Sequence, residues 1–281
     1  MNKQSEPKGS LCLFFKKMKY YLLFCLLLCA SWKVQAQKLH VVYEYIPSAV
    51  ATFREHVYFE NGIKTAIRDS IAVKANTEKG KGSEEEVSSS FSLVLGTGTN
   101  YRNIVIQTSD KNELQETRAV KGTNYLVTDQ FPGLSWNTNY TDTDTIGKFV
   151  CHKATANYRG SKIVAYYTND IPVPAGPYKF GGLPGLIVML YNEGANPNYW
   201  TLQEVSYPYE GSVPLNKGYI YSLPKLSLQD YIKKSDARVE EQMRIMESKM
   251  PAIKGVTTER TKVRGTVEQI YEWEQKGLNE K

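Results

Sequence analysis

The stretch from residue 176 to residue 187 reads GPYKFGGLPGLI, and it joins a rigid bend to an apolar strand. Its prolines fix the backbone φ angle and lack an amide donor, whereas its glycines allow angles that other residues avoid. Pro184 followed by Gly185 is typical of the central pair of a type II turn. The run LIVML at 186 to 190 predicts a buried strand. The residues that we expect to hold the bend in a structural role are Gly176, Pro177, Gly181, Gly182, Leu183, Pro184, Gly185, Leu186 and Ile187.

Around this bend, short runs of alternating apolar and polar residues, rich in Tyr, Val and Thr, predict half-buried strands. No long helical pattern interrupts them, so neighbouring strands are expected to pair antiparallel, with the clearest hairpin turning at Arg159 and Gly160. A polar stretch at 74 to 90 predicts a loop. The predicted strands span 39–45, 56–60, 63–67, 90–95, 102–107, 125–128, 148–156, 162–168, 186–192 and 199–206.

Two helical patterns follow the predicted strands. Ser227 and Asp230 form a capping box before an amphipathic helix that reaches about residue 250. Thr266 and Gln269 repeat the capping signal before a short helix. We expect both apolar stripes to dock on the sheet rather than bind a partner. Those stripes contain Leu228, Tyr231, Ile232, Val239, Met243 and Met246, and then Ile270, Tyr271 and Trp273. The fold class expected is mainly β: a curved antiparallel sheet, half-barrel or sandwich-like, with one or two C-terminal helices packed on it.

The first 36 residues differ in kind from the rest. Lysines precede the apolar run YYLLFCLLLCA, and Val34 and Ala36 follow at the small-residue positions of a cleavage site. This pattern predicts a secretory signal peptide, with Met18 as an alternative start. The run is too short for a membrane-spanning helix, so the mature chain should have none. The expected organisation is a leader at 1–36, an antiparallel β domain at 37–222 and a helical segment at 223–281, in a protein exported to the periplasm or outer-membrane periphery, or secreted.

The positive charge of the chain belongs largely to this leader. Because residues 1 to 36 hold six lysines and one glutamate, their removal lowers the formal net charge from +6 to +1. A nearly neutral chain lacks the wide basic surface that nucleic-acid binding requires. We therefore expect no nucleic-acid partner.

No catalytic or cofactor motif is present: the sequence contains no nucleophile elbow, HExxH, paired CxxC or GxxxxGKS. Cys151 is the single cysteine after the leader, and on a strand it shares a face with Phe149. A buried free cysteine acting as a small hydrophobe is the simplest interpretation, since a thiol nucleophile would need a basic neighbour. The histidines His40, His56 and His152 show no metal-ligand spacing. We expect no metal and no cofactor.

The bend and its flanks resemble a known family. GGLPGLI, with GPYKF and IPVPA before it, is similar to the signature of the GLPGLI family of exported Bacteroidetes proteins. Upstream, Trp136, the run GKFVCHKATANYRG at 147–160 and AYYTNDIP at 165–172 follow the family's order, so the resemblance covers roughly residues 38 to 200. It implies that Trp136, Cys151 and Tyr178 are associated with the motif. The family has no assigned activity, and its members often accompany outer-membrane transporters.

Three hypotheses for function remain. The first is a non-catalytic binding or scaffold protein of the cell envelope, accessory to an outer-membrane importer or another envelope protein. The second is a carrier of an apolar ligand or lipid in a half-barrel groove, with the long helix as a lid. The third is a hydrolase without a recognisable motif. An exposed recognition surface is a further hypothesis for the tyrosines beside prolines and glycines, which are Tyr207, Tyr209, Tyr219 and Tyr221.

Overall fold

A computed structural model gives the structure, and it describes residues 38–47, 52–69, 103–108, 111–194, 197–249 and 264–278. The predicted signal peptide, the loop at 74–90 and the strand at 90–95 lie outside these residues. The described strands are β1 (Leu39–Pro47), β2 (Phe53–Glu60), β3 (Ile63–Arg68), β4 (Asn103–Thr108), β5 (Glu113–Val120), β6 (Thr123–Gln130), β7 (Thr143–Ile146), β8 (Phe149–Tyr158), β9 (Ser161–Thr168), β10 (Leu186–Asn192), β11 (Asn198–Ser206) and β12 (Lys225–Ser227).

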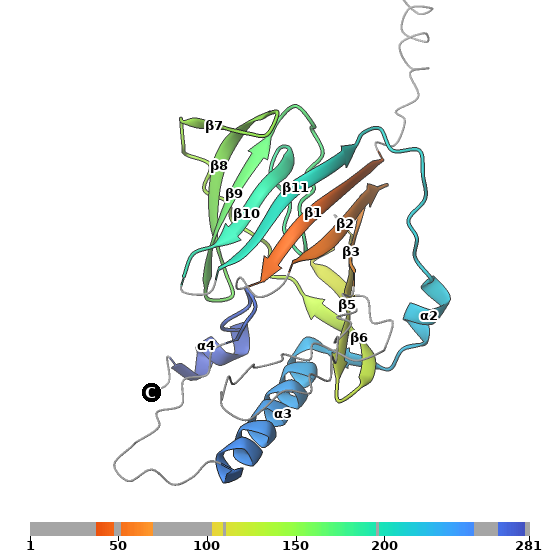
Figure 1. Cartoon of the computed structure of the whole chain (residues 1–281), viewed down its shortest axis with the longest axis vertical. Helices are drawn as coiled ribbons and strands as arrows, with labels where there is room; N and C mark the ends of the chain where they lie inside the picture. Colours follow the sequence, from red (N-terminus) through yellow and green to blue (C-terminus); the bar gives the residue numbers. More distant parts are fainter. Residues whose placement is uncertain are drawn as a thin grey trace, which may run out of the picture. The chain divides into compact units, whose positions relative to one another are not determined.

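The described strands form one open, curved sheet in the order β12-β6-β5-β4-β3-β2-β1-β11-β10-β9-β8-β7. Two antiparallel meanders, β1 to β6 and β7 to β11, join where β11 pairs with β1. Only β12 lies parallel to its neighbour, β6. Figure 1 shows the sheet turning along its width, with β5 and β6 rotated relative to β9, β10 and β11. The expected curved, mainly antiparallel sheet is confirmed.

Tight turns connect several strand pairs in this sheet. The β8–β9 hairpin turns at Arg159 and Gly160, as predicted, and both residues have positive φ, at 45° and 81°. Asn61 with Gly62 and Lys121 with Gly122 make equivalent turns, with φ between 51° and 77°. Two consecutive left-handed residues match the twist of the flanking strands, which sets the pairing register.

The sequence patterns missed three strands: β5, β7 and β12. Strand β5 reads ELQETRAV, and its inward-facing positions include Glu116 and Arg118, which are buried or nearly so. Alternation of apolar and polar residues fails there because charged side chains point into the protein. The other two strands have only four and three residues, so neither carries a periodic signal.

The main core lies on one face of the sheet, here called the inner face. Alternate residues of β1, such as Leu39, Val41 and Tyr43, are fully buried on it. Trp200 of β11 is also buried there, and its ring stacks on Tyr45 with centroids 4.5 Å apart. The period-two placement of apolar residues along the strands thus builds a continuous core beneath the bend.

The long helix α3 (Leu228–Lys249) follows β12 and a short helix, α2 (Lys217–Ser222). Its predicted capping box is confirmed, because the Asp230 amide donates to Ser227 Oγ at 3.1 Å. Docking of its whole apolar stripe is wrong: Val239 and Met246 are 54% and 46% exposed. Only its first turns pack on β6 and β12, since α3 then projects past this edge of the sheet (Figure 1). Its docked residues are Leu228, Tyr231 and Ile232.

The last described segment, residues 264 to 278, contains helix α4 (Glu272–Leu278). The capping box predicted at Thr266 and Gln269 is wrong, because the helix begins at Glu272. There the Glu274 carboxylate accepts a hydrogen bond from the Tyr271 amide at 3.0 Å, which caps the first turn. Within the described part of the chain, every helix is too short or too polar to cross a membrane.

Candidate functional site

The bend at 176 to 187 crosses the inner face of the sheet and inserts its GPYKF residues into the core. Tyr178, Lys179 and Phe180 are all buried. The Tyr178 amide donates to a carboxylate oxygen of Glu55 on β2 at 2.5 Å. Trp136 donates from its indole nitrogen to the Gly181 carbonyl at 3.0 Å. Residues distant in sequence therefore hold the motif in place.

The glycines of the bend serve two different purposes. Gly182 has a φ of 83°, which an L-residue with a side chain seldom adopts. Gly185 has no positive φ, so the predicted type II turn is wrong. A Cβ atom at Gly185 would collide with the carbonyl of Thr168 at the end of β9. Gly185 is required because two backbones approach closely there.

Lys179 stands at the centre of a buried ionic network, although the sequence interpretation assigned it no role. Its ammonium group is fully buried and lies 2.8 to 2.9 Å from carboxylate oxygens of Glu116, Asp129 and Glu268. Glu116 and Asp129 come from the inner face of β5 and β6, and Glu268 comes from the segment after α3. One lysine of the motif thus joins the sheet to the C-terminal segment.

Two arginines complete this network. Arg159, in the β8–β9 turn, lies 2.6 Å from Asp129 and 2.5 Å from Glu268. Arg118 on β5 lies 2.6 Å from Glu268. The hydroxyls of Tyr158 and Tyr178 also donate to Glu268, at 2.9 and 3.2 Å. The buried ionic network is defined as Arg118, Arg159 and Lys179 with Glu116, Asp129 and Glu268, so its three cations balance three carboxylates.

The pKa shifts reflect this pairing. Burial alone would raise the pKa of the Glu268 carboxyl, but Lys179, Arg118 and Arg159 hold it well below its usual value. Burial would likewise lower the pKa of Lys179, and Glu116 and Glu268 outweigh burial and raise it. Glu268 and Lys179 are therefore charged near neutral pH, and each has partners of opposite charge, as buried charges require.

Lys64 on β3 lies near this network in a different environment. Its ammonium donates to the Phe180 carbonyl at 2.5 Å, and burial lowers its pKa to about 7, despite the nearby Glu55. Lys64 also lines a pocket of about 360 Å³ together with Lys179, Gly181 and Gly182. Glu55 is engaged mainly by Arg68, at 2.6 Å. Lys64 is thus a buried amine with incomplete charge compensation.

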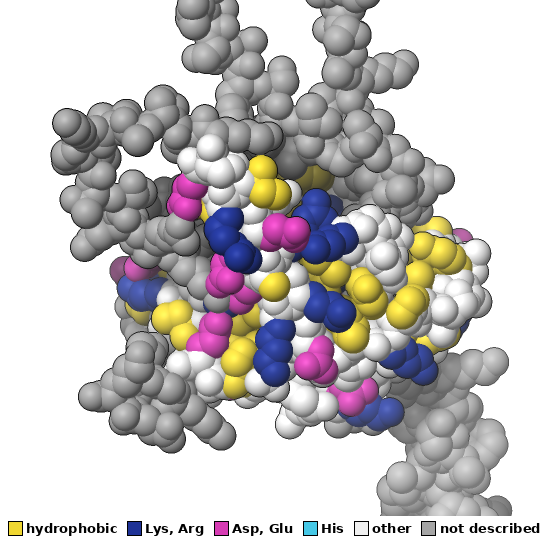
Figure 2. Space-filling view, turned by 90° about the horizontal axis from the view of Figure 1, so that it is seen from below, with side chains coloured by type: hydrophobic (Ala, Val, Ile, Leu, Met, Phe, Trp, Pro, Cys, Tyr) yellow, Lys and Arg dark blue, Asp and Glu magenta, His cyan; other side chains and the backbone are white. Residues whose placement is uncertain are grey.

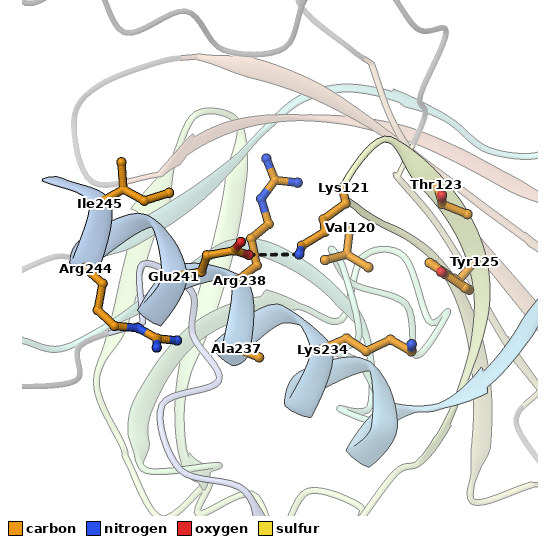
Figure 3. A pocket seen from close by; sticks show the side chains of 10 residues that line it. All are labelled: Val120, Lys121, Thr123, Tyr125, Lys234, Ala237, Arg238, Glu241, Arg244 and Ile245. Atoms are coloured by element: carbon orange, nitrogen blue, oxygen red, sulfur yellow. Dashed lines mark hydrogen bonds and ion pairs between the residues drawn. The ribbon is translucent and has the colours of Figure 1, made fainter.

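An open groove of about 690 Å³ lies between the β5–β6 hairpin and α3. Figure 3 shows Lys121 of the hairpin facing Glu241 of α3, with which it pairs at 2.9 Å. Neither Lys234 nor Arg238 forms an ion pair with any carboxylate of the described residues. The lining of this groove, called here the α3 groove, is Val120, Lys121, Thr123, Tyr125, Lys234, Ala237, Arg238, Glu241, Arg244 and Ile245.

The α3 groove carries an excess of positive charge, since four cationic side chains and one carboxylate line it. In Figure 3 Arg238 and Arg244 leave α3 on opposite sides of the helix. Figure 2, which views the molecule from below Figure 1, shows Lys and Arg side chains interspersed with Asp, Glu and apolar ones. The groove therefore offers an anion both charge and apolar contact.

The four candidate recognition tyrosines lie at two separate places. Tyr209 packs on His40, with ring centroids 5.1 Å apart, and Tyr207 contacts the main core. Tyr219 and Tyr221 lie on α2, each 49% exposed, and Tyr219 accepts a hydrogen bond from Asn124 of β6. The structure does not bring the two pairs together into one surface.

Cys151 and the histidines occupy positions away from both ionic sites. Cys151 is buried on β8 outside the core that holds the motif, and burial raises the pKa of its thiol to about 11. His40 and His56 stack on neighbouring strands, 3.2 Å apart between ring nitrogens, whereas His152 lies on β8. In the described part of the chain, no group of three or more His, Cys, Asp or Glu side chains is arranged to hold a metal ion.

Comparisons with known proteins point to the bend. A family model described as "Protein of unknown function (Porph_ging)", a Bacteroidetes-associated domain, matches residues 157–189, which run from the β8–β9 hairpin into β10. No curated protein matches the chain. Solved structures that match include PNGF-II in the C2 space group, at 14% identity and a TM-score of 0.46, covering 71% of this chain and 32% of that one. PNGF-II in the P21 space group gives 14% identity and the same TM-score, with 70% and 33% covered. The chain spans about a third of the length of PNGF-II.

The sequence interpretation missed the charged residues of the buried network. One signal could have revealed some of them: in β5, Leu114, Glu116 and Arg118 alternate, so charges occupy the face marked by a buried leucine. Arg159 occupies a left-handed turn position where Asn or Asp is usual, which is a second signal. Nothing in the sequence pattern links Glu268 to these residues.

Proposed function

We propose that this chain is an exported cell-envelope protein of the GLPGLI type with a non-catalytic binding or scaffold role. Its α3 groove would hold an acidic segment of a partner protein, such as an envelope protein or an outer-membrane importer component. The observation that carries this proposal is the position of Lys234 and Arg238 in the groove, where neither lies within ion-pair distance of a carboxylate of the described residues. Carboxylates of a partner could form ion pairs with these two side chains.

The contrast with the protein interior supports this assignment. The buried cations Lys179 and Arg159 have carboxylates within 3 Å. Cations on an open surface have no such requirement, because water solvates them, yet their gathering around one concave site raises the local positive potential. Such a site speeds the association of an anionic partner and selects against basic ones.

Apolar groups beside the cations favour a polypeptide over a small anion. Ile245 lines the groove and is 50% exposed, and Val239 and Met243 are exposed on the same helix. Tyr125 and Val120 add apolar surface from the hairpin side. A segment that alternates acidic and apolar residues could contact both kinds of lining at once, which a free phosphate or carboxylate could not.

The carrier hypothesis receives less support from the inner face. The space beneath the curved sheet is occupied by the protein's own Tyr178, Phe180 and Trp200, which are all buried and pack against one another with centroids about 6 Å apart. An apolar ligand would have to displace these side chains. The bend therefore fills the place where a lipid would lie.

Charge reversal in the groove tests the proposed binding. The probe is a fluorescent peptide that alternates Glu and Leu, with a Gln–Leu peptide of equal length for comparison. We expect fluorescence anisotropy to show preferential binding of the acidic peptide to the wild-type chain lacking residues 1 to 36. The double substitution K234E/R238E should weaken binding by about tenfold or more, because two attractions become repulsions.

A matched control has the same charge change elsewhere. Lys148 and Lys162 are exposed at the β7–β8 turn and on β9, away from the α3 groove. The variant K148E/K162E should therefore retain binding to within about twofold, apart from screening by salt. Equal losses in both double variants, or equal binding of the acidic and Gln–Leu peptides, would refute a role for the groove.

Export has its own test, which does not depend on the groove. Expression of the full chain in a Bacteroidetes host, followed by cell fractionation and N-terminal sequencing, should place a chain beginning near Gln37 in the envelope or medium. A chain found in the cytoplasm with its N-terminus intact would contradict the export proposal.

A further inference from the structure

Five side chains of the sheet and the bend converge on one carboxylate. Arg159, Lys179 and Tyr158 approach one oxygen of Glu268 at 2.5, 2.8 and 2.9 Å. Arg118 and Tyr178 donate to the other oxygen, at 2.6 and 3.2 Å. The set Arg118, Tyr158, Arg159, Tyr178 and Lys179 is called here the carboxylate cradle.

All members of the cradle belong to β5, β8, the β8–β9 turn or the bend, and none belongs to the segment that carries Glu268. Their positions are fixed by other contacts as well. Arg159 is held by Asp129 at 2.6 Å, and Lys179 is held by Glu116 at 2.9 Å. Contacts other than Glu268 thus orient these donors, which is the property of a preorganised binding site.

Charge balance shows what such a site accepts. Without the segment that carries Glu268 and Glu272, the three cations of the cradle face two carboxylates, Glu116 and Asp129, and one positive charge remains uncompensated. A single carboxylate restores neutrality and satisfies donors on both of its oxygens. A neutral group would leave a buried cation without compensation, which is costly.

Contacts beside Glu268 define the surroundings that a ligand would meet. Val267 and Tyr271 are buried, in the main core and in the cluster beneath α3, respectively. The amides of Gln269 and Ile270 both donate to the Arg159 carbonyl, at 2.8 and 2.9 Å. The cradle and its surroundings thus contact an apolar residue (Val267), the glutamate that follows it (Glu268) and an aromatic residue three positions after the glutamate (Tyr271). The backbone between Glu268 and Tyr271 is held by the Arg159 carbonyl.

We propose that the cradle is a carboxylate-binding site for a glutamate-bearing peptide, occupied in this structure by the chain's own segment 264–278. The segment acts as an internal ligand. A peptide with the same pattern can take its place when Glu268 is absent from the cradle. This inference concerns the inner face of the sheet and is independent of the α3 groove.

Chemical rescue of a full-length E268A variant tests the proposal. Thermal unfolding is followed at pH 7 in increasing sodium acetate, with sodium chloride at matched ionic strength as reference. We expect acetate to raise the Tm of E268A with a saturable dependence, because it re-enters the cradle. Wild-type protein should show no such increase. The variant E272A should also show no increase in Tm. It removes a carboxylate that contacts Arg159, but the Glu272 side chain is 44% exposed.

A second measurement uses the segment itself as the probe. A fluorescent peptide of residues 264 to 278 should bind E268A and not the wild type, whose cradle is filled. The same peptide with glutamine in place of Glu268 should bind about tenfold more weakly or worse, because the charged hydrogen bonds are lost. If E268A does not fold, its refolding from urea should recover in acetate and not in chloride.

Two results would overturn the proposal. Acetate and chloride having the same effect on the unfolding or refolding of E268A would show that the cradle does not accept a carboxylate. Equal binding of the glutamate and glutamine peptides would show that Glu268 is not the group recognised. Since neither experiment involves Lys234 or Arg238, both are distinguishable from failure of the α3 groove proposal.

Discussion

The buried ionic network and the α3 groove use the same kinds of side chain in opposite ways. In the network, Lys179 and Arg159 lie within 3 Å of carboxylates and are almost fully enclosed. In the groove, Lys121 pairs with Glu241 while 63% of its side chain remains exposed, and Lys234 has no ion pair with a described residue. Loss of a charge should therefore damage the fold in the first region and leave it intact in the second.

This difference separates structural from functional charge. The GPYKF residues of the bend reach into the buried ionic network, so Lys179 stabilises the fold. Cations in the groove are exposed, so we expect them to contribute little to folding. Four substitutions test this contrast, in order of decreasing effect on stability.

The largest effect is expected from Gly185→Val, which should prevent native folding. The Cβ of valine would meet the Thr168 carbonyl, and neither backbone can move without disrupting β9 and β10. Circular dichroism and urea unfolding should show no cooperative transition. Gly182→Ala is the control in the same bend, because nothing lies near its Cβ and only its positive φ costs about 1 kcal/mol. A native unfolding curve for Gly185→Val would refute the close-approach argument.

Lys179→Met should lower the free energy of unfolding by about 3–5 kcal/mol, the range for breaking a buried ion pair. Methionine fills similar space, but Glu116, Asp129 and Glu268 would then share only two arginines. Urea unfolding at pH 7 measures this loss. A decrease in the free energy of unfolding below about 1 kcal/mol would show that Lys179 contributes no more than a surface charge does, and the two regions would then not differ.

Lys64→Met should change how stability depends on pH. Because the folded pKa of Lys64 is about 7 against 10.5 in the unfolded chain, the unfolded state binds more protons between these values. Stability of the wild type should therefore rise with pH from about 7 toward 9.5, by roughly 1 kcal/mol per pH unit. The variant should lack this rise and be more stable than wild type at pH 7. Parallel curves for the two proteins would show that Lys64 keeps an ordinary pKa.

The smallest effect is expected from Lys121→Ala in the groove. Its ion pair with Glu241 is exposed at both ends, and such pairs contribute little to stability because water and salt screen them. Urea unfolding at low and high salt should show a slight loss, smaller still at high salt. A loss comparable to that of Lys179→Met would mean that the groove is part of the folding core.

Much of the sheet could be predicted because its strands alternate as expected. Leu186–Asn192 was predicted with the correct bounds, and the Arg159–Gly160 hairpin with the correct turn. Strand β5 was missed since Glu116 and Arg118 occupy inward positions, which a hydrophobic pattern interprets as exposed. The start of the last helix was misplaced, since the Thr266 hydroxyl accepts from the Glu268 amide outside any helix.

Prediction of the sites was less complete, for a physical reason. Periodicity shows which face of a strand is apolar, but it does not show which distant charges meet. Glu268 and Arg159 are 109 positions apart, and only the folded sheet brings them within 2.5 Å. The groove likewise depends on how far α3 projects beyond the sheet edge, which is set by packing at Tyr231 and Ile232.

The position of Glu268 along the chain has a consequence for biogenesis. All twelve described strands, and with them Arg118, Arg159 and Lys179, are synthesised before Glu268. Until then, the interior carries one cation in excess and remains hydrated, so the interior can dehydrate only after the last segment arrives. A chain truncated before residue 264 would leave this interior open to proteases, so incomplete chains should be degraded faster than complete ones.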